Sequence, residues 1–401
     1  RAGSNAYSSP LGTQVFDGSY LWDSTTGETI AEFTGEQLPI TEVHPLEPSG
    51  RFLVVAYGKV FRLDLNQTEP LLPMQQDHEL HIYRAFPAHT NGTAVATGTR
   101  KNEFLLQSWN LDDGALRDSF SVGGDYAPIY ALNADRALVY SNRTIGVWDI
   151  PARRKLCTIG SEEDSVFDGA LSPDGRWVLT DDCAVNIPSD NYDSPYELGE
   201  LRDALTGRYV RTFVHRQHYK RPDVLDYPDT DGIAFSPAGD AVTVGDCGFD
   251  KEKRGCIVFW DTLTGRRKKV LRSEDDLNIE SIKFSAEGRR AITCDTEQNI
   301  LLWDFDSDKI LRRFAGIHNG NTPPEITRDG RRLVTIHDGS LRLFDLATGE
   351  ESLRVVILNQ GEYEKPKYEW LALTPQGLFD GSPDARQHVG VRVGTGLNVV
   401  P

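Results

Sequence analysis

One short pattern recurs along the whole chain and restricts what it can fold into. In its clearest copy, residues 256–265, an apolar run ends in Trp260-Asp261 and is followed by a Thr-Gly turn. A continuous apolar and aromatic run of this length is typical of a buried strand, and Gly265 is free to adopt a positive φ angle in the turn. The pattern therefore predicts the inner half of a β-hairpin. Copies end at Trp22-Asp23, Leu63-Asp64, Trp109-Asn110, Trp148-Asp149, Arg202-Asp203, Trp303-Asp304 and Phe344-Asp345.

The spacing of the copies predicts the architecture. Five of the seven spacings between strand-ending residues fall between 39 and 46 residues, and five of the seven tryptophans occupy the same position of the pattern. Several units also contain a polar turn, clearest at 172–175, and the apolar strand that follows usually carries a threonine, as at Thr180, Thr243, Thr293 and Thr335. Units of about 40 to 45 residues with four short strands are typical of propeller blades. We predict an all-β propeller of four-stranded antiparallel blades, with eight blades and seven as the alternative, forming one domain over 1–401.

With these motifs in view, the units resemble WD-repeat β-propellers. The resemblance implies that the tryptophans are buried between blades and that the final aspartate fixes a turn. The chain departs from the family pattern because it lacks the usual Gly-His pair, Asn110 replaces aspartate and Arg202 replaces tryptophan. Those units are expected to be irregular, with blade packing that depends more on apolar burial.

The end of the chain carries a second resemblance. Residues 370–383 are similar to the closing segment of bacterial WD-repeat proteins, some of which carry a caspase-like peptidase domain elsewhere. The segment also contains further apolar strands, so we expect 360–401 to be a closing or packing tail that covers an exposed sheet edge. Because the chain opens on Arg1, it is expected to be a segment of a longer protein.

Charge and composition exclude several function classes. Acidic residues outnumber basic ones, 60 to 43, so the surface is expected to repel a phosphate backbone, and no nucleic-acid partner is predicted. No apolar run is long enough for a bilayer, so no membrane partner is predicted either. Five cysteines without a short paired spacing favour thiols and a cytoplasmic location. Cys247 and Cys256 flank one loop and are also expected to be thiols.

The motifs in the sequence predict no catalytic site, no cofactor and no metal. The chain has no phosphate-binding loop, zinc-type Cys-x-x-Cys spacing or nucleophile elbow. Two histidine pairs, His78 with His81 and His215 with His218, have a spacing that suits a metal only on a helix, and none is expected there. The acidic cluster at 226–231 is interpreted as a solvated turn, and the basic run at 266–269 as a solvated strand face.

Three segments are longer than blade closure requires: 181–200, 215–231 and 245–255. Because successive strands of a blade reverse direction, these segments are expected to emerge at one end of two adjacent blades. Their tyrosines and cations suit a protein surface, whereas the alternative is that the segments are solvated loops without a partner. The candidate partner-binding residues are Asn191, Tyr192, Tyr196, His218, Tyr219, Arg221, Lys251 and Arg254.

From the sequence we predict a non-enzymatic protein-interaction or scaffold module that binds a protein or peptide and belongs to a larger bacterial protein. One alternative is a regulatory domain that holds an effector, such as a caspase-like peptidase in the same polypeptide or complex, in check. A further alternative is a propeller enzyme that uses its central pocket; such an enzyme needs converging carboxylates, histidines or a cofactor, and no such set is recognisable.

Overall fold

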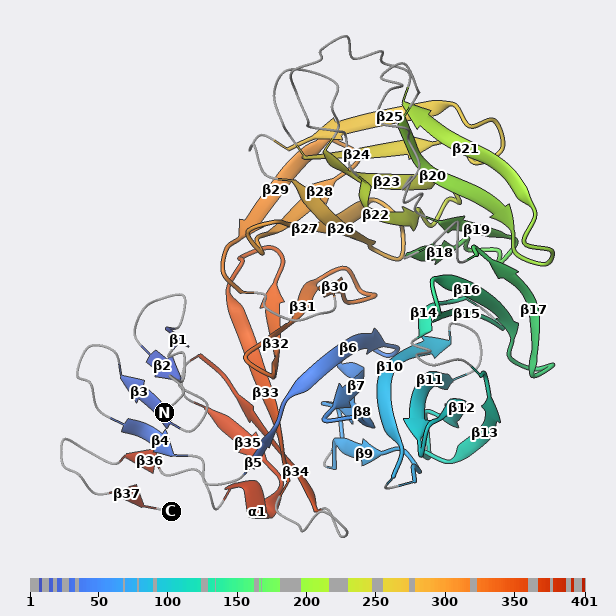
Figure 1. The fold of residues 1–401 in the computed structure, drawn as a ribbon. Coiled ribbons are helices and arrows are strands. Elements are labelled where there is room, and N and C mark those ends of the chain that lie inside the picture. The colour runs from blue at the N-terminus through green and yellow to red at the C-terminus, as the bar shows by residue number, and fades with distance from the viewer. Residues whose placement is uncertain are drawn as a thin grey trace. The chain divides into compact units, whose positions relative to one another are not determined.

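The fold is given by a computed structural model of the chain. It describes residues 7–8, 14–16, 20–23, 29–32, 36–67, 69–77, 79–88, 92–123, 129–133, 135–161, 166, 168–180, 196–215, 230–246, 255–273, 278–317, 323–359, 367–375, 378–386, 391–392 and 399–400. The protein is a β-propeller with seven blades of antiparallel strands, and the helical content of the described chain is one short helix (Figure 1). The all-β propeller prediction is confirmed.

The chain divides into two compact units. Unit 2 comprises 74–318 and 323–326, and contains five four-stranded blades and the short strand β30 (Glu325–Ile326). Within it, the innermost strands of successive blades lie against one another (Figure 1). Its blades are blade 2, with β10 (His81–Ala88), β11 (Thr93–Arg100), β12 (Glu103–Asn110) and β13 (Leu116–Ser121); blade 3, with β14 (Ile129–Asn133), β15 (Arg136–Ser141), β16 (Thr144–Asp149) and β17 (Arg154–Ile159); blade 4, with β18 (Gly169–Leu171), β19 (Trp177–Thr180), β20 (Tyr196–Asp203) and β21 (Tyr209–His215); blade 5, with β22 (Thr230–Phe235), β23 (Ala241–Asp246), β24 (Gly255–Trp260) and β25 (Arg267–Arg272); and blade 6, with β26 (Ile279–Phe284), β27 (Arg290–Asp295), β28 (Ile300–Asp304) and β29 (Lys309–Phe314).

Unit 1 comprises 1–73, 319–322 and 327–401 and contains the first and last blades. Its elements are a sheet of β1 (Tyr7–Ser8), β2 (Gln14–Phe16), β3 (Tyr20–Asp23) and β4 (Thr29–Glu32); strand β5 (Glu36–Leu38); blade 1, with β6 (Ile40–Leu46), β7 (Arg51–Ala56), β8 (Lys59–Asp64) and β9 (Leu71–Pro73); blade 7, with β31 (Arg332–His337), β32 (Ser340–Asp345) and β33 (Glu351–Asn359); then β34 (Tyr368–Leu373), β35 (Phe379–Gly381), α1 (Pro383–Arg386), β36 (Val391–Arg392) and β37 (Val399–Val400).

The prediction of eight blades is wrong, and the stated alternative of seven is correct. Blades 1 and 7 pack directly on each other: Phe52 and Phe61 of blade 1 share one buried cluster with Leu341 of blade 7. The hydroxyl of Ser49 donates a 2.8 Å hydrogen bond to Asp329 across the same junction. The repeat that ends at Asp23 is the separate sheet β1–β4, which therefore does not lie between blades 1 and 7.

The C-terminal strands cover the outer edge of blade 7. Strand β34 pairs antiparallel with β33, with Ile357 opposite Trp370, and β35 pairs in turn with β34. The far end of β33 also pairs with β5, where Ile357 lies opposite Leu38. In unit 2, by contrast, β13, β17, β21, β25 and β29 end their sheets. The division of the whole chain into one domain with a closing tail stays a prediction.

The expectation that all cysteines are thiols is wrong for Cys256 and its bonding partner. Cys256, at the start of β24, is disulfide-bonded, and its partner lies outside the described residues. Cys157 and Cys294 are free thiols, and burial raises the pKa of Cys294 to about 12. Sequence spacing did not separate these cases because bond formation depends on where the sulfur atoms lie in space.

Candidate functional site

The Trp-Asp pattern makes a repeated structural unit within the blades. In blade 5, Trp260 is buried against Phe213 of blade 4, with ring centroids 5.8 Å apart, and its indole N–H donates to the Thr243 hydroxyl at 3.1 Å. In blade 6, the indole of Trp303 donates to Thr293 at 2.9 Å. The expected burial of these tryptophans between blades is confirmed, and the threonine of the second strand is the acceptor that satisfies each buried indole.

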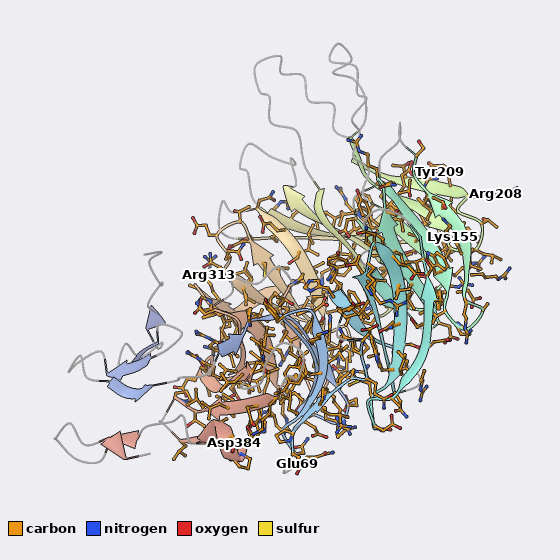
Figure 2. The ribbon with its side chains drawn as sticks, turned by 60° about the horizontal axis from the view of Figure 1, so that its bottom comes forward. Glu69, Lys155, Arg208, Tyr209, Arg313 and Asp384 are labelled. Carbon is orange, nitrogen blue, oxygen red and sulfur yellow. The ribbon has the colours of Figure 1, made fainter. Side chains whose placement is uncertain are left out.

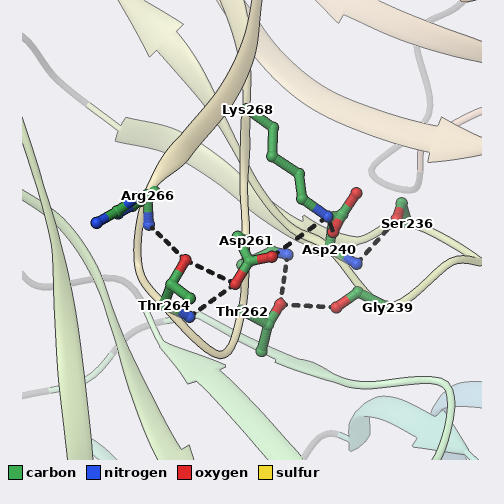
Figure 3. A network of polar contacts seen from close by, with 9 residues as sticks. Ser236, Gly239, Asp240, Asp261, Thr262, Thr264, Arg266 and Lys268 are labelled. Carbon is green, nitrogen blue, oxygen red and sulfur yellow. Dashed lines mark hydrogen bonds and ion pairs between the residues drawn. The ribbon is translucent and has the colours of Figure 1, made fainter.

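The aspartate that follows the tryptophan organises the turn between the third and fourth strands. Asp261 accepts hydrogen bonds from the backbone N–H of Thr264 at 2.7 Å and from its hydroxyl at 2.8 Å (Figure 3). Gly265 closes the turn with φ of 70°. The Thr264 hydroxyl bond, followed by the backbone bond, lowers the pKa of Asp261. Asp203 makes the same contacts with Thr206, so the aspartate is structural, as the resemblance implied.

A second set of contacts ties this turn to the turn between the first and second strands. The Thr262 hydroxyl donates to the carbonyl of Gly239 at 2.6 Å and accepts from the N–H of Ala241 at 2.9 Å (Figure 3). The ammonium of Lys268 lies 2.6 Å from Asp240 and 3.5 Å from Asp261. We call the end of the blades that carries these two turns the turn end, and the opposite end the loop end.

Blade 4 departs from this unit because Arg202 occupies the tryptophan position. The guanidinium of Arg202 pairs with Glu200 on the same strand, with Nε 2.9 Å from the carboxylate. Thr180, which corresponds to Thr243 of blade 5, is fully buried, and its hydroxyl has no hydrogen-bond partner in the part of the chain that the structure describes. The substitution at 202 therefore removed the donor that the threonine normally satisfies.

The loop end distinguishes blades 4 and 5 from the others. In blades 1, 2, 3 and 7 the second and third strands are joined by two residues, each with positive φ, as in a type I′ turn. These turns are Tyr57-Gly58, Lys101-Asn102, Asn142-Arg143 and Asp338-Gly339. Blade 6 uses residues 296–299 at this position. Blades 4 and 5 instead use 181–195 and 247–254, which lie outside the described residues.

The residues that flank each insertion, which we call its roots, lie together at the ends of the strands. Thr230, the first residue of β22, pairs with Gly245, and Gly245 also pairs with Cys256, so two insertion roots share one end of blade 5. In blade 4, Tyr196 pairs with His215 where the other insertion roots begin. Because β22 also contacts strands of blade 4, the three insertions start at the loop end of adjacent blades.

Most of the predicted partner-binding residues lie outside the described chain: Asn191, Tyr192, His218, Tyr219, Arg221, Lys251 and Arg254. Tyr196 is placed on the backbone as the first residue of β20. Of the histidine pairs, His81 is the first residue of β10 and His215 the last of β21, so neither lies on a helix, while His78 and His218 lie outside the described chain. The assignment of a binding role to these residues stays a prediction.

Sequence reasoning missed a buried ionic cluster on blade 7. Arg342 is 3% exposed and lies 3.4 Å from Asp338 and 3.6 Å from Glu351, and Arg354 lies 3.3 Å from Glu351. Arg342 and Arg354 are cross-strand neighbours, so Glu351 separates two like charges that would otherwise repel. The only sequence signal was a pair of arginines in strands that otherwise read as apolar.

Comparison with protein-family models found none that matches the chain. Within the described residues, no group of three or more histidine, cysteine or acidic side chains is arranged to hold a metal ion. Nor does the described chain include a helix with the length and apolar character needed to cross a membrane.

Proposed function

We propose that this chain is a non-enzymatic protein-interaction module of the WD-repeat type that binds a protein or peptide at the loop end of blades 4 and 5. The observation that supports this proposal is the contrast at one topological position: four blades close with two residues, whereas blades 4 and 5 carry the long connections 181–195 and 247–254. Long loops on a rigid scaffold are where binding residues concentrate.

The composition of the insertions supports a protein partner. Tyrosine and arginine are enriched at protein interfaces, because they offer large contact areas with a polar end. Tyr192, Tyr219 and Arg221 provide these groups, and the cations of this region contrast with an acidic chain. We further propose that the module is cytoplasmic and forms part of a larger bacterial protein, in which it recruits a partner or holds an effector domain.

The experiment compares binding to native partners by two purified variants. The triple variant Tyr192→Ala, Tyr219→Ala, Arg221→Ala is expected to lose partners that the wild-type chain retains from a lysate of the source organism. The matched control is Glu287→Ala with Arg289→Ala, two exposed residues at or next to the first-to-second-strand turn of blade 6. Among the described residues, the side chain of Arg289 makes a single ion pair, 3.9 Å from the exposed Asp306, so its loss costs little.

Both variants must retain the circular dichroism spectrum and thermal midpoint of the wild-type protein. If the folded triple variant keeps every partner while the control loses them, binding uses the turn end and the proposal is wrong. Turnover of a substrate by the purified chain would overturn the non-enzymatic assignment.

A further inference from the structure

The outermost strands of blades 3 to 6 carry charge of one sign. Their sequences are RKLCTI in β17, YVRTFVH in β21, RKKVLR in β25 and KILRRF in β29. Lysine and arginine supply ten of these residues, and aspartate and glutamate supply none, although acidic residues outnumber basic ones, 60 to 43, in the whole chain. These four strands are therefore far more basic than the chain as a whole.

These strands are linked by the turns between them into one continuous surface. The turn that leads into each outer strand lies against the outer strand of the preceding blade. A Cβ added at Gly207 would lie 3.3 Å from Cβ of Cys157, and one added at Gly265 would lie 3.2 Å from the guanidinium of Arg211. The ammonium of Lys269 donates to the carbonyl of Phe305 at 3.0 Å. We call this surface, made of β17, β21, β25, β29 and the turns leading into them, the basic rim.

Exposed apolar side chains lie on the same surface. Tyr209 is 54% exposed on β21, and Leu205 and Leu263 are 53% and 69% exposed in the turns before β21 and β25. Among the described residues, eight large hydrophobic side chains are exposed, and five belong to the basic rim: these three with Val210 and Leu311. Figure 2 shows Lys155, Arg208 and Tyr209 together at the edge of the ribbon. Cations and apolar groups thus share one surface.

Protection of sheet edges explains only part of this arrangement. Charged residues on a terminal strand prevent edge-to-edge aggregation, but a charge of either sign does so, and exposed leucines work against it. Some of the cations neutralise nearby carboxylates, as Lys268 does with Asp240. Lys155, Arg208 and Arg266, however, are exposed and make no ion pair with any residue in the described parts of the chain.

We propose that the basic rim binds an acidic protein segment that also carries apolar side chains. Acidic groups of the segment would pair with Arg208 and Arg266, and its apolar groups would contact Leu205 and Leu263. Strands β21 and β25 end their sheets, so an extended segment can add to them as a further strand through backbone hydrogen bonds. The turns that carry Arg208 and Arg266 lie at the turn end of blades 4 and 5, opposite the loop end, and the inference does not depend on the function proposed there.

The probe is a fluorescein-labelled peptide of alternating glutamate and leucine, about ten residues long, which matches a long strand. Binding to the full chain is followed by fluorescence anisotropy. The variant Arg208→Glu with Arg266→Glu is expected to bind at least about tenfold more weakly, since two attractive contacts become repulsive. The variant Leu205→Ser with Leu263→Ser is expected to lose about fivefold or more in affinity through lost apolar contact.

The matched control is Lys101→Glu with Arg331→Glu, which changes the net charge equally at two exposed positions outside the rim. It is expected to keep its affinity within about twofold. Raising the ionic strength from about 0.01 M to about 0.1 M shortens the screening length from about 30 Å to about 10 Å and should weaken binding to the wild-type chain. Amide hydrogen exchange should slow in β21 or β25 on binding.

Several results would overturn the inference. Equal loss in the control would mean that only net charge matters. An unchanged leucine variant, together with equally tight binding of polyglutamate or a single-stranded oligonucleotide, would assign the rim to polyanions in general. If the peptide does not bind but vesicles containing phosphatidylserine bind through the same arginines, the partner of the rim is an anionic membrane surface. Self-association that the rim variant abolishes would assign it to a second copy of the chain.

Discussion

The hydroxyl groups of Thr180 and Thr243 occupy corresponding positions in adjacent blades, yet only the replacement of Thr243 by valine should destabilise the protein. Thr243 accepts the indole N–H of Trp260 at 3.1 Å in a buried environment. Thr243→Val keeps the shape of the side chain but leaves that N–H unsatisfied, which costs about 1–3 kcal/mol. Thr180→Val removes a buried hydroxyl that has no partner among the described residues, so stability should stay unchanged or rise by up to about 1 kcal/mol.

Thermal unfolding followed by calorimetry measures the difference. An unfolding entropy of about 2.1 cal/mol/K per residue makes 1 kcal/mol equivalent to roughly 1 °C for a cooperative chain of 401 residues. Thr243→Val should therefore lower the midpoint by about 1–3 °C, and Thr180→Val should not lower it. In a Trp260→Phe background, which has no indole donor, Thr243→Val should lose most of its effect. Equal destabilisation by the two threonine variants would refute the assignment of Trp260 as the donor that blade 4 lacks.

Three further predictions concern single residues. Hydrogen bonds from Thr264 lower the folded-state pKa of Asp261, so the contribution of this carboxylate to stability is present above the unfolded pKa and is lost as the pH falls through the folded pKa. The variant Asp261→Asn should therefore flatten the stability–pH profile below about pH 4, and an unchanged profile would contradict this. Glu351→Ala should destabilise the chain by about 3 kcal/mol in thermal unfolding, because the buried positive charge of Arg342 loses one of its carboxylate partners. A loss below about 1 kcal/mol would show that Asp338 alone neutralises the charge of Arg342. Gly98→Ala places a Cβ 2.4 Å from the carbonyl oxygen of His81 and should lower the thermal midpoint by the equivalent of about 2 kcal/mol or more; an unchanged midpoint would show that β10 yields at little cost.

Local chemistry made the strands and turns predictable. Residues 257–260 form an apolar run ending at Asp261, and the Thr264-Gly265 turn needs a hydroxyl donor and a positive φ, all of which are visible in the sequence. The position of the insertions was predictable for the same reason, since strand alternation fixes the end at which each connection emerges. The side chains proposed for binding there remain a prediction.

Only the tertiary structure decided the number of blades, the state of Cys256 and the accumulation of charge on the rim. Eight copies of the pattern were present, but the propeller has seven blades, because Phe61 and Leu341 bring the first and last blades into direct contact. Copies of a repeat specify each sheet through local contacts, whereas the contact between the first and last blades depends on packing between residues that are hundreds of positions apart. The basic rim was likewise hidden, because its cations come from four strands separated in sequence and gather only when the blades stand side by side.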